Sequence, residues 1–219
     1  MKSQNKASNI ISPAKAREIL LTLEGIYPDA APALHFSSAY ELMVAVVLSA
    51  QCTDERVNKV TSELFTIANT PHQMLELGIE KLTKIVTPCG LGASKAKHII
   101  NASQRIVEVF NGEFPCELED LLSLEGVGIK SASVIRSVWF GIPAIAVDTH
   151  VFRVANRIGL AKANTPEATQ LQLMDILDES VWSHAHHLLI FHGRRICHAR
   201  KPECSNCPLN KCCQWYKNQ

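Results

Sequence analysis

The chain has 219 residues, of which 47% are hydrophobic, 20% charged and 6% aromatic, enough for one or two compact domains with an apolar core. The 22 basic and 21 acidic residues give a formal net charge of +1, which excludes a histone-like basic coat and an acidic disordered tail. Ten glycines and ten prolines are ordinary shares and exclude collagen-like and low-complexity chains.

The sequence carries no signal for export or membrane insertion. Residues 1–8 lack the apolar stretch of a signal peptide, and the longest apolar run, 42–48, is far shorter than the roughly 20 residues of a membrane-spanning helix. We therefore expect a soluble, cytoplasmic protein with no membrane partner. In a reducing compartment, clustered cysteines are more often metal ligands or redox groups than disulfides.

Apolar residues recur at helical spacing along most of the chain and predict an all-α fold. The run 42–48 is apolar on every side, and with Ser37 or Ser38 as its cap it favours a central buried helix. Its three valines leave a buried strand as the alternative. Amphipathic helices are also expected over 96–110, 132–139 and 151–158, and proline-led helix starts at Thr70-Pro71 and Thr165-Pro166.

Residues 121–132, Leu-Leu-Ser-Leu-Glu-Gly-Val-Gly-Ile-Lys-Ser-Ala, predict a tight turn between two helices. Gly126 and Gly128 permit the positive φ angles of such a turn. The second helix begins at once, so its free N–H groups and the positive end of its dipole suit a phosphate. A plain connection between two helices is the alternative, since glycine turns are common.

One lysine and one aspartate near this turn are candidates for chemistry. Lys130 lies in the first turn of the second predicted helix, where a cation is disfavoured and the neutral, nucleophilic amine is favoured. Taken alone, a solvated surface lysine is the better interpretation, and it is the context downstream that favours chemistry. Downstream, the apolar segment 144–147 leads to Asp148, which precedes the helix pattern of 151–158. Asp148 is a typical N-cap residue, and a cap can still present its second oxygen to a pocket.

Five of the eight cysteines lie beyond residue 196, and four of them follow the spacing Cys-x6-Cys-x2-Cys-x5-Cys: Cys197, Cys204, Cys207 and Cys213. Four thiolates in one short loop can bind a tetrahedral zinc ion or an iron–sulfur cluster. The unequal intervals favour iron–sulfur. The fifth, Cys212, is left over, and the remaining three are expected to be free thiols: Cys52, Cys89 and Cys116.

The same loop carries two adjacent cations, Arg200 and Lys201. They form a small basic patch that a phosphate would meet. A solvated loop face is the alternative interpretation of the pair.

In this order, the hairpin, the segment Val-Asp-Thr-His at 147–150 and the four-cysteine loop resemble the endonuclease III family of DNA glycosylases. The resemblance runs from about Ser38 to Cys213. It departs from the family pattern at Glu125, where the hairpin often has proline, and at Ile129, where a basic residue often precedes the lysine. The matching segments besides the cysteine loop are 48–54, 90–91, 94–96, 124–132 and 145–157.

The resemblance implies a helix-hairpin-helix glycosylase fold with two helical domains. Residues 34–142 would form a six-helix barrel that contains the helix-hairpin-helix at about 118–140. Residues 1–33 would join 143–219 in a domain that holds a [4Fe–4S] cluster on the four cysteines. It is the resemblance that implies [4Fe–4S] rather than zinc.

The implied activity is base excision repair of double-stranded DNA that contains oxidised pyrimidines or abasic sites. Lys130 would attack the sugar C1′ of a flipped-out nucleotide and expel the base. Asp148, expected to face Lys130 across the DNA cleft, would activate the amine or stabilise positive charge on the sugar. The Schiff base then acts as an electron sink, and β-elimination cleaves the strand 3′ to the abasic site. These steps describe a bifunctional DNA glycosylase and AP lyase.

Two further residues acquire DNA-binding roles from the resemblance. Gln51 matches the residue that enters the gap left by the flipped nucleotide, and Leu91 matches the wedge opposite it. A polar amide can pair with the orphaned base, and an apolar tip can fill the stack. The alternative is that Gln51 is an ordinary helix-end residue and Leu91 an ordinary loop residue.

Other functions fit parts of the pattern. A non-catalytic helix-hairpin-helix DNA-binding iron–sulfur protein would have no need of the Lys130–Asp148 pair, and a zinc-stabilised helical interaction protein would use the thiols differently. Adenine mismatch glycosylases have a similar hairpin and cluster, but they lack a lysine at position 130 and carry an extra C-terminal domain. A monomer is expected.

Overall fold

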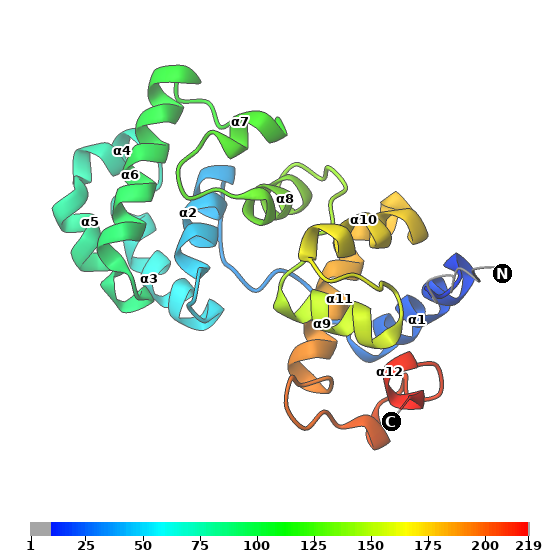
Figure 1. The fold of residues 1–219 in the computed structure, drawn as a ribbon. Coiled ribbons are helices and arrows are strands. Elements are labelled where there is room, and N and C mark those ends of the chain that lie inside the picture. Colours follow the sequence, from blue (N-terminus) through cyan, green and yellow to red (C-terminus); the bar gives the residue numbers. More distant parts are fainter. Residues whose placement is uncertain (1–9, 219) are drawn as a thin grey trace. The chain divides into compact units, whose positions relative to one another are not determined.

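The computed structural model describes residues 10–218, and every regular element in that range is helical (Figure 1). The predicted all-α fold is therefore confirmed. Short 3-10 turns η1, η2 and η3 span Thr87–Cys89, Glu179–Val181 and Cys204–Asn206. The α-helices are α1 Pro13–Ile26, α2 Ala39–Ser49, α3 Asp54–Ile67, α4 Pro71–Leu77, α5 Ile79–Val86, α6 Gly92–Val109, α7 Leu118–Leu122, α8 Ile129–Val138, α9 Thr149–Ile158, α10 Pro166–Ile176, α11 Trp182–Arg195 and α12 Gln214–Lys217.

The chain folds as two compact units. One comprises residues 32–142, and the other joins the chain before residue 32 to the chain after residue 142. The six-helix barrel and the iron–sulfur domain expected for 34–142 and for 1–33 with 143–219 stay predictions. Within residues 10–218, no helix combines the length and the apolar content that crossing a membrane requires.

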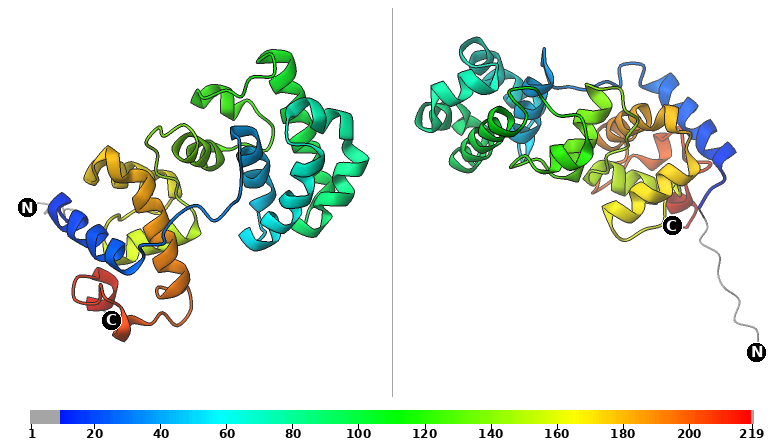
Figure 2. Two further views of the ribbon diagram at one scale, coloured as in Figure 1. Left: turned by 180° about the vertical axis from the view of Figure 1, so that it is seen from behind. Right: turned by 90° about the horizontal axis from the view of Figure 1, so that it is seen from above.

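The unit 32–142 is built around α2, which packs against α3, α6 and α8 (Figures 1 and 2). Leu42, Met43 and Val44 are fully or almost fully buried, as expected for a helix that is apolar on every side. Ser38 caps the helix, because its Oγ accepts the backbone N–H of Glu41 at 3.1 Å. The helix interpretation of 42–48 is confirmed over the strand.

The second unit has its own core, in which α9 and α11 pack together and α1 and α12 join them from opposite ends of the sequence. The apolar face of α9, Val151, Val154 and Ile158, is buried there. Arg195 of α11 forms a bidentate ion pair with Asp29, which follows α1, at 2.6 and 3.2 Å. The contact of α1 with α11 makes this unit discontinuous in sequence.

Burial of His187 on α11 gives this unit a pH-dependent stability. Burial, and then the charges of His186 and His184, lower the pKa of His187 from its ordinary value of 6.5 to about 4. In the unfolded chain His187 takes up a proton near pH 6.5, whereas in the folded chain it stays neutral down to about pH 4. The stability of the fold therefore falls as the pH drops from about 6.5 towards 4. The loss is of the order of 2 to 3 kcal/mol. We expect thermal unfolding of His187→Phe to depend less on pH between 7.5 and 5 than that of the wild type; equal dependence would contradict this assignment.

Candidate functional site

The predicted hairpin between α7 and α8 is present, and its two glycines have different reasons to be glycine. Gly126 has φ +85°, and a Cβ on it would lie 2.9 Å from Cβ of His98, so both the backbone and the packing require glycine. Gly128 has φ −91° and caps α8, and a Cβ built there would meet no atom within 4 Å. Val127, between them, is buried and anchors the turn in the core.

The start of α8 offers unpaired backbone donors. The first backbone bond of the helix is donated by Ala132 N–H to the Gly128 carbonyl, at 2.9 Å. No side chain caps this end of the helix. The N–H groups ahead of that bond therefore point out of the turn, beside the open space at Gly128. This arrangement suits an anion.

Lys130 is the second residue of α8 and is exposed to solvent. Ile129 next to it is also exposed, at 54% of its surface. The carboxylate of Glu125, the departure from the family hairpin, is held by α6: Nδ2 of Asn101 donates to it at 2.5 Å, and Nε2 of His98 lies 3.6 Å away. Glu125 is thus engaged by residues of its own unit.

Asp148 is the N-cap of α9, as the sequence predicts. Its Oδ1 accepts the backbone N–H groups of His150 and Val151, both at 2.8 Å. The residue is half-buried, and both of these bonds use the same oxygen. Oδ2 is left for another partner. Lys130 belongs to the unit 32–142 and Asp148 to the other unit.

Gln51 and Leu91 both lie in exposed turns with a left-handed backbone, at φ 56° and 53°. Positive φ is uncommon for residues other than glycine. Leu91 exposes 63% of its surface, which is unusual for leucine in a tight turn. Gly92 follows it, and a Cβ there would lie 2.9 Å from the Cα of Thr87. This turn is therefore closely packed against the start of η1.

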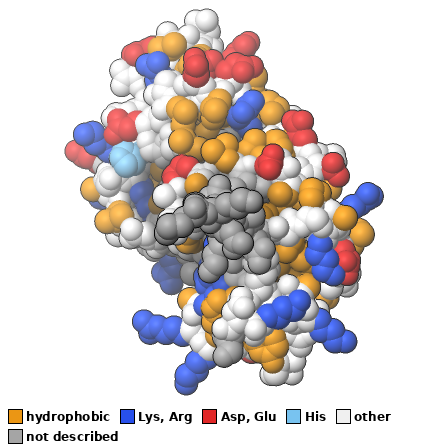
Figure 3. Space-filling view, turned by 45° about the vertical axis from the view of Figure 1, so that its right-hand side comes forward, with side chains coloured by type: hydrophobic (Ala, Val, Ile, Leu, Met, Phe, Trp, Pro, Cys, Tyr) orange, Lys and Arg blue, Asp and Glu red, His pale blue; other side chains and the backbone are white. Residues whose placement is uncertain are grey.

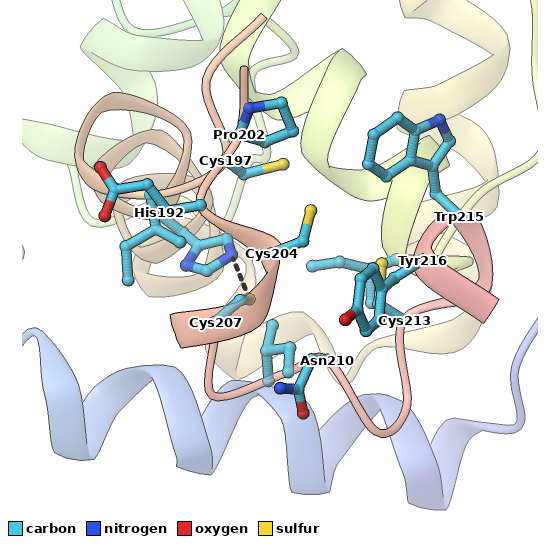
Figure 4. A pocket seen from close by; sticks show the side chains of 13 residues that line it. His192, Cys197, Pro202, Cys204, Cys207, Asn210, Cys213, Trp215 and Tyr216 are labelled. Carbon is cyan, nitrogen blue, oxygen red and sulfur yellow. Dashed lines mark hydrogen bonds between the residues drawn. The ribbon is translucent and has the colours of Figure 1, made fainter. Parts of the chain in front are cut away.

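The four cysteines of the predicted ligand set line one pocket (Figure 4). Apolar side chains complete its wall, among them Ile158, Leu209 and Trp215. Burial raises the pKa of the Cys207 thiol to about 11 and also raises that of Cys204. Cys212 does not line the pocket, and its Sγ instead donates to the carbonyl of Leu209 at 3.2 Å.

The thiol pocket differs from a site for a single metal ion. Among residues 10–218, no three His, Cys, Asp or Glu side chains are gathered closely enough to hold one ion. An iron–sulfur cluster makes a different demand, because its irons take one thiolate each. Four thiols spread around one largely apolar pocket fit that demand.

Three residues that sequence reasoning missed support this pocket. Nε2 of buried His192 lies 3.6 Å from Sγ of Cys207 (Figure 4). Nδ1 of the same ring lies 3.0 Å from the Tyr27 hydroxyl. With Tyr27 donating to Nδ1, Nε2 carries the proton and donates to the sulfur. Burial lowers the pKa of His192 to about 4, so the ring is neutral at pH 7.

The other two are arginines one turn apart on α9. Arg153 donates to the carbonyls of Cys197 and Gly193 at 3.0 and 2.9 Å. Arg157 donates to the carbonyls of His198 and Ala199, and its Nη1 lies 3.5 Å from Sγ of Cys197. Their spacing of four residues on the helix that Asp148 caps was the available signal, since it places both on one face.

Arg200 and Lys201 are both exposed, in the turn between Cys197 and Cys204. Lys201 has φ 51°. Lysine and arginine side chains gather at the lower end of the face drawn in Figure 3. Arg200 and Lys201 belong to the C-terminal segment that follows Cys197. That segment also contains Lys211 and Lys217, so a local excess of positive charge exists despite a net charge of +1.

Comparison with known proteins agrees with this geometry. Residues 44–179 match the family model described as "HhH-GPD superfamily base excision DNA repair protein". Endonuclease III of Rickettsia conorii is 47% identical over 191 residues, which are 87% of this chain and 91% of that protein.

Two solved structures are similar over nearly the whole chain. One is described as a non-covalent endonuclease III–DNA complex and the other as a trapped endonuclease III–DNA covalent intermediate. Each is 40% identical with a TM-score of 0.90 and covers 95% of this chain; the match takes in 98% of the first and 99% of the second. The resemblance drawn from the sequence is thereby confirmed.

Proposed function

This chain belongs to the endonuclease III family of the HhH-GPD superfamily of base excision DNA repair proteins, and we propose that Lys130 and Asp148 carry out its reaction on damaged pyrimidines in duplex DNA. The family relationship makes the chain a DNA glycosylase and AP lyase. The observation that carries the assignment of residues is the position of Lys130. It is an exposed amine directly after a helix start that has no side-chain cap and has open space at Gly128.

The hairpin supplies the phosphate contact in this proposal. A DNA phosphate approaches the free N–H groups at the start of α8 most closely where no side chain stands in the way, and Gly128 leaves that space open. Backbone donors need no surplus of lysine or arginine, which accounts for DNA binding by a chain of net charge +1. Arg200 and Lys201 add a second, local phosphate contact.

The reaction follows from the chemistry of an amine. Neutral Nζ of Lys130 bonds to C1′, the glycosidic bond breaks, and the base leaves with the bonding electron pair and takes up a proton. Ring opening gives an iminium, which withdraws electrons from C2′. Loss of a C2′ proton then expels the 3′ phosphate. Water hydrolyses the remaining imine and releases Lys130 as the free amine. A water nucleophile would stop after base removal.

Asp148 has the geometry for an accompanying role. Oδ1 is committed to the N-terminus of α9, and this fixes the direction of the carboxylate. Oδ2 is the oxygen that accepts a proton from the amine or faces positive charge on the sugar. We propose that capping and catalysis are carried by different oxygens of one side chain.

We propose that Gln51 and Leu91 enter the duplex where the nucleotide leaves it. Their exposed positions in tight, left-handed turns place a polar and an apolar tip at the surface of one unit. An amide can hydrogen-bond the orphaned base, and a leucine can replace the lost stacking.

The cofactor of this proposal is a [4Fe–4S] cluster on Cys197, Cys204, Cys207 and Cys213. When bound, such a cluster orders a loop that has little core of its own. Arg153, Arg157 and His192 hold the first and third cysteines from the protein side, through bonds to the Cys197 carbonyl and to sulfur.

Two serine variants test the choice of ligands. We expect Cys204→Ser to lose most of its iron, because a hydroxyl is a poor substitute for a thiolate, and Cys212→Ser to retain about four irons per chain. Iron and zinc are measured on anaerobically purified protein, together with visible absorbance. Loss of iron from Cys212→Ser would show that the ligand set is wrong, and a colourless wild type that contains zinc would support the zinc alternative.

Borohydride trapping tests the function itself. Reduction of the iminium by hydride converts the Schiff base into a stable amine that links protein to DNA. We expect the wild type to form this adduct with duplexes that contain an oxidised pyrimidine, and not with undamaged DNA. A wild type that binds the duplex without forming the adduct would support the non-catalytic alternative.

A further inference from the structure

A buried lysine in the unit 32–142 has no part in the reaction described above. Lys95, on the first turn of α6, is only 3% exposed. Lysine is almost never fully buried unless its ammonium is paired, because removing the charge from water is costly. No carboxylate among the described residues forms an ion pair with Lys95, so another reason for its burial is needed.

Two backbone carbonyls receive this ammonium. Nζ of Lys95 donates to the carbonyls of Leu48 and Cys89, each at 2.8 Å. Leu48 is in the last turn of α2, and Cys89 is the last residue of η1. Carbonyls at the C-terminal end of a helix lack helical partners and carry partial negative charge, which makes them suitable acceptors for a cation.

These two acceptors lie at the bases of the two turns that carry Gln51 and Leu91. Leu48 precedes Gln51 by one short turn of chain, and Cys89 stands just ahead of Leu91. Both tips have φ values near +55°, a conformation that persists only where its surroundings enforce it. A single side chain therefore ties together the two strained turns, which are far apart in the sequence.

We propose that Lys95 is a positioning residue that holds the Gln51 turn and the Leu91 turn in register for entry into the DNA duplex. This proposal rests on the roles proposed above for Gln51 and Leu91. Lys95 itself is buried and touches no DNA. It acts by fixing the backbone from which the two tips project.

The first test separates positioning from stability. Lys95→Met keeps the length of the side chain and removes all donors. Ser103→Ala is the matched control, because it removes a buried 2.6 Å hydrogen bond to Tyr40 from the same helix, away from both turns. We expect Lys95→Met to slow base removal from a duplex by about ten-fold or more, since small misplacements of positioning groups have effects of that size.

A second substrate shows which step is affected. At an abasic site in single-stranded DNA no nucleotide has to be replaced in a stack, so we expect β-elimination by Lys95→Met to change less than about three-fold. Ser103→Ala should alter neither rate by more than about two-fold. Equal losses on the two substrates would indicate a merely structural lysine and overturn the proposal. Lys95→Arg, which still has two N–H donors for the carbonyls, should recover most of the duplex activity.

A double-mutant cycle tests the route of the effect. In a chain that carries both Gln51→Ala and Leu91→Ala, adding Lys95→Met should slow duplex base removal by less than about two-fold further, because the groups it positions are gone. An undiminished ten-fold effect would overturn the proposal. If Lys95→Met fails to fold, the same cycle is run with Lys95→Gln, whose shorter side chain keeps one amide donor group.

A readout without DNA distinguishes failure of this proposal from failure of the proposed function. The Cys89 thiol is buried, and burial followed by the neighbouring Cys52 thiol raises its pKa to about 11, so it should react slowly with iodoacetamide. We expect Lys95→Met, but not Ser103→Ala, to speed alkylation of Cys89 by at least about five-fold in peptide mapping by mass spectrometry. Unchanged alkylation would refute the idea that Lys95 holds the two turns together. If the wild type is inactive on DNA but Lys95→Met still speeds alkylation of Cys89, the proposed function on DNA is refuted, and the structural role of Lys95 in the two turns is not.

Discussion

Replacing Lys130 with alanine should abolish borohydride trapping and strand cleavage while leaving DNA binding in place. The amine is the only group in the proposed reaction that can form an iminium, so β-elimination has no substitute route. We expect the rate of strand cleavage at an abasic site to fall by at least about 10³-fold. The measurement is single-turnover cleavage and trapping on duplexes with an oxidised pyrimidine or an abasic site.

The fold should tolerate this change, since Lys130 is exposed and its side chain caps nothing in α8. Removing a cation from the first turn of a helix is neutral or slightly favourable to stability. Lys81→Ala, at an exposed position on α5, is the matched control and should retain trapping. A Lys130→Ala protein that still forms the adduct would move the nucleophile to another residue.

Local signals in the sequence were sufficient for part of the helices, among them α2, α6 and α9, and for the proline-led starts of α4 and α10, but they left α1, α3, α5 and α11 unassigned. Thr70 and Thr165 cap α4 and α10 through Oγ1, each followed by proline, because both features act within a single turn of chain. Asp148 was identified as a cap for the same reason. The hairpin glycines were found, but the different needs of Gly126 and Gly128 depend on His98, which comes from another helix.

Contacts between residues that are distant in the chain could not be predicted from the sequence. Helical spacing places Lys95 on the buried face of α6 with Ile99 and Ile106, but it does not reveal that the ammonium reaches the carbonyls of Leu48 and Cys89. Arg157 reaches the cysteine pocket because α9 packs against α11, and His192 meets Cys207 because the loop after α11 folds back onto that helix. The four cysteines themselves were recognisable, since their spacing lies within one loop. Supporting residues are hard to predict because their partners are distant in the chain.

Asp148→Asn should separate the two roles of that side chain. Asparagine keeps an Oδ1 that accepts the N–H groups of His150 and Val151, so α9 remains capped. It removes the negative charge and the proton acceptor that the amine needs. We expect base removal to slow by about 10²-fold or more, with DNA binding nearly unchanged and the free energy of unfolding within about 1 kcal/mol of wild type.

Two further variants show that a lost cap alone does not cause the defect. Asp148→Ala removes the charge and the cap, and it should add a loss of stability of about 1 to 2 kcal/mol to the same loss of activity. Thr165→Ala removes the cap of α10 in the same unit and should lower stability by about 1 kcal/mol, with base removal close to wild type. If Asp148→Asn kept base removal close to wild type and only Asp148→Ala lost it, Asp148 would be a structural cap, and the carboxylate that assists Lys130 would have to be sought elsewhere.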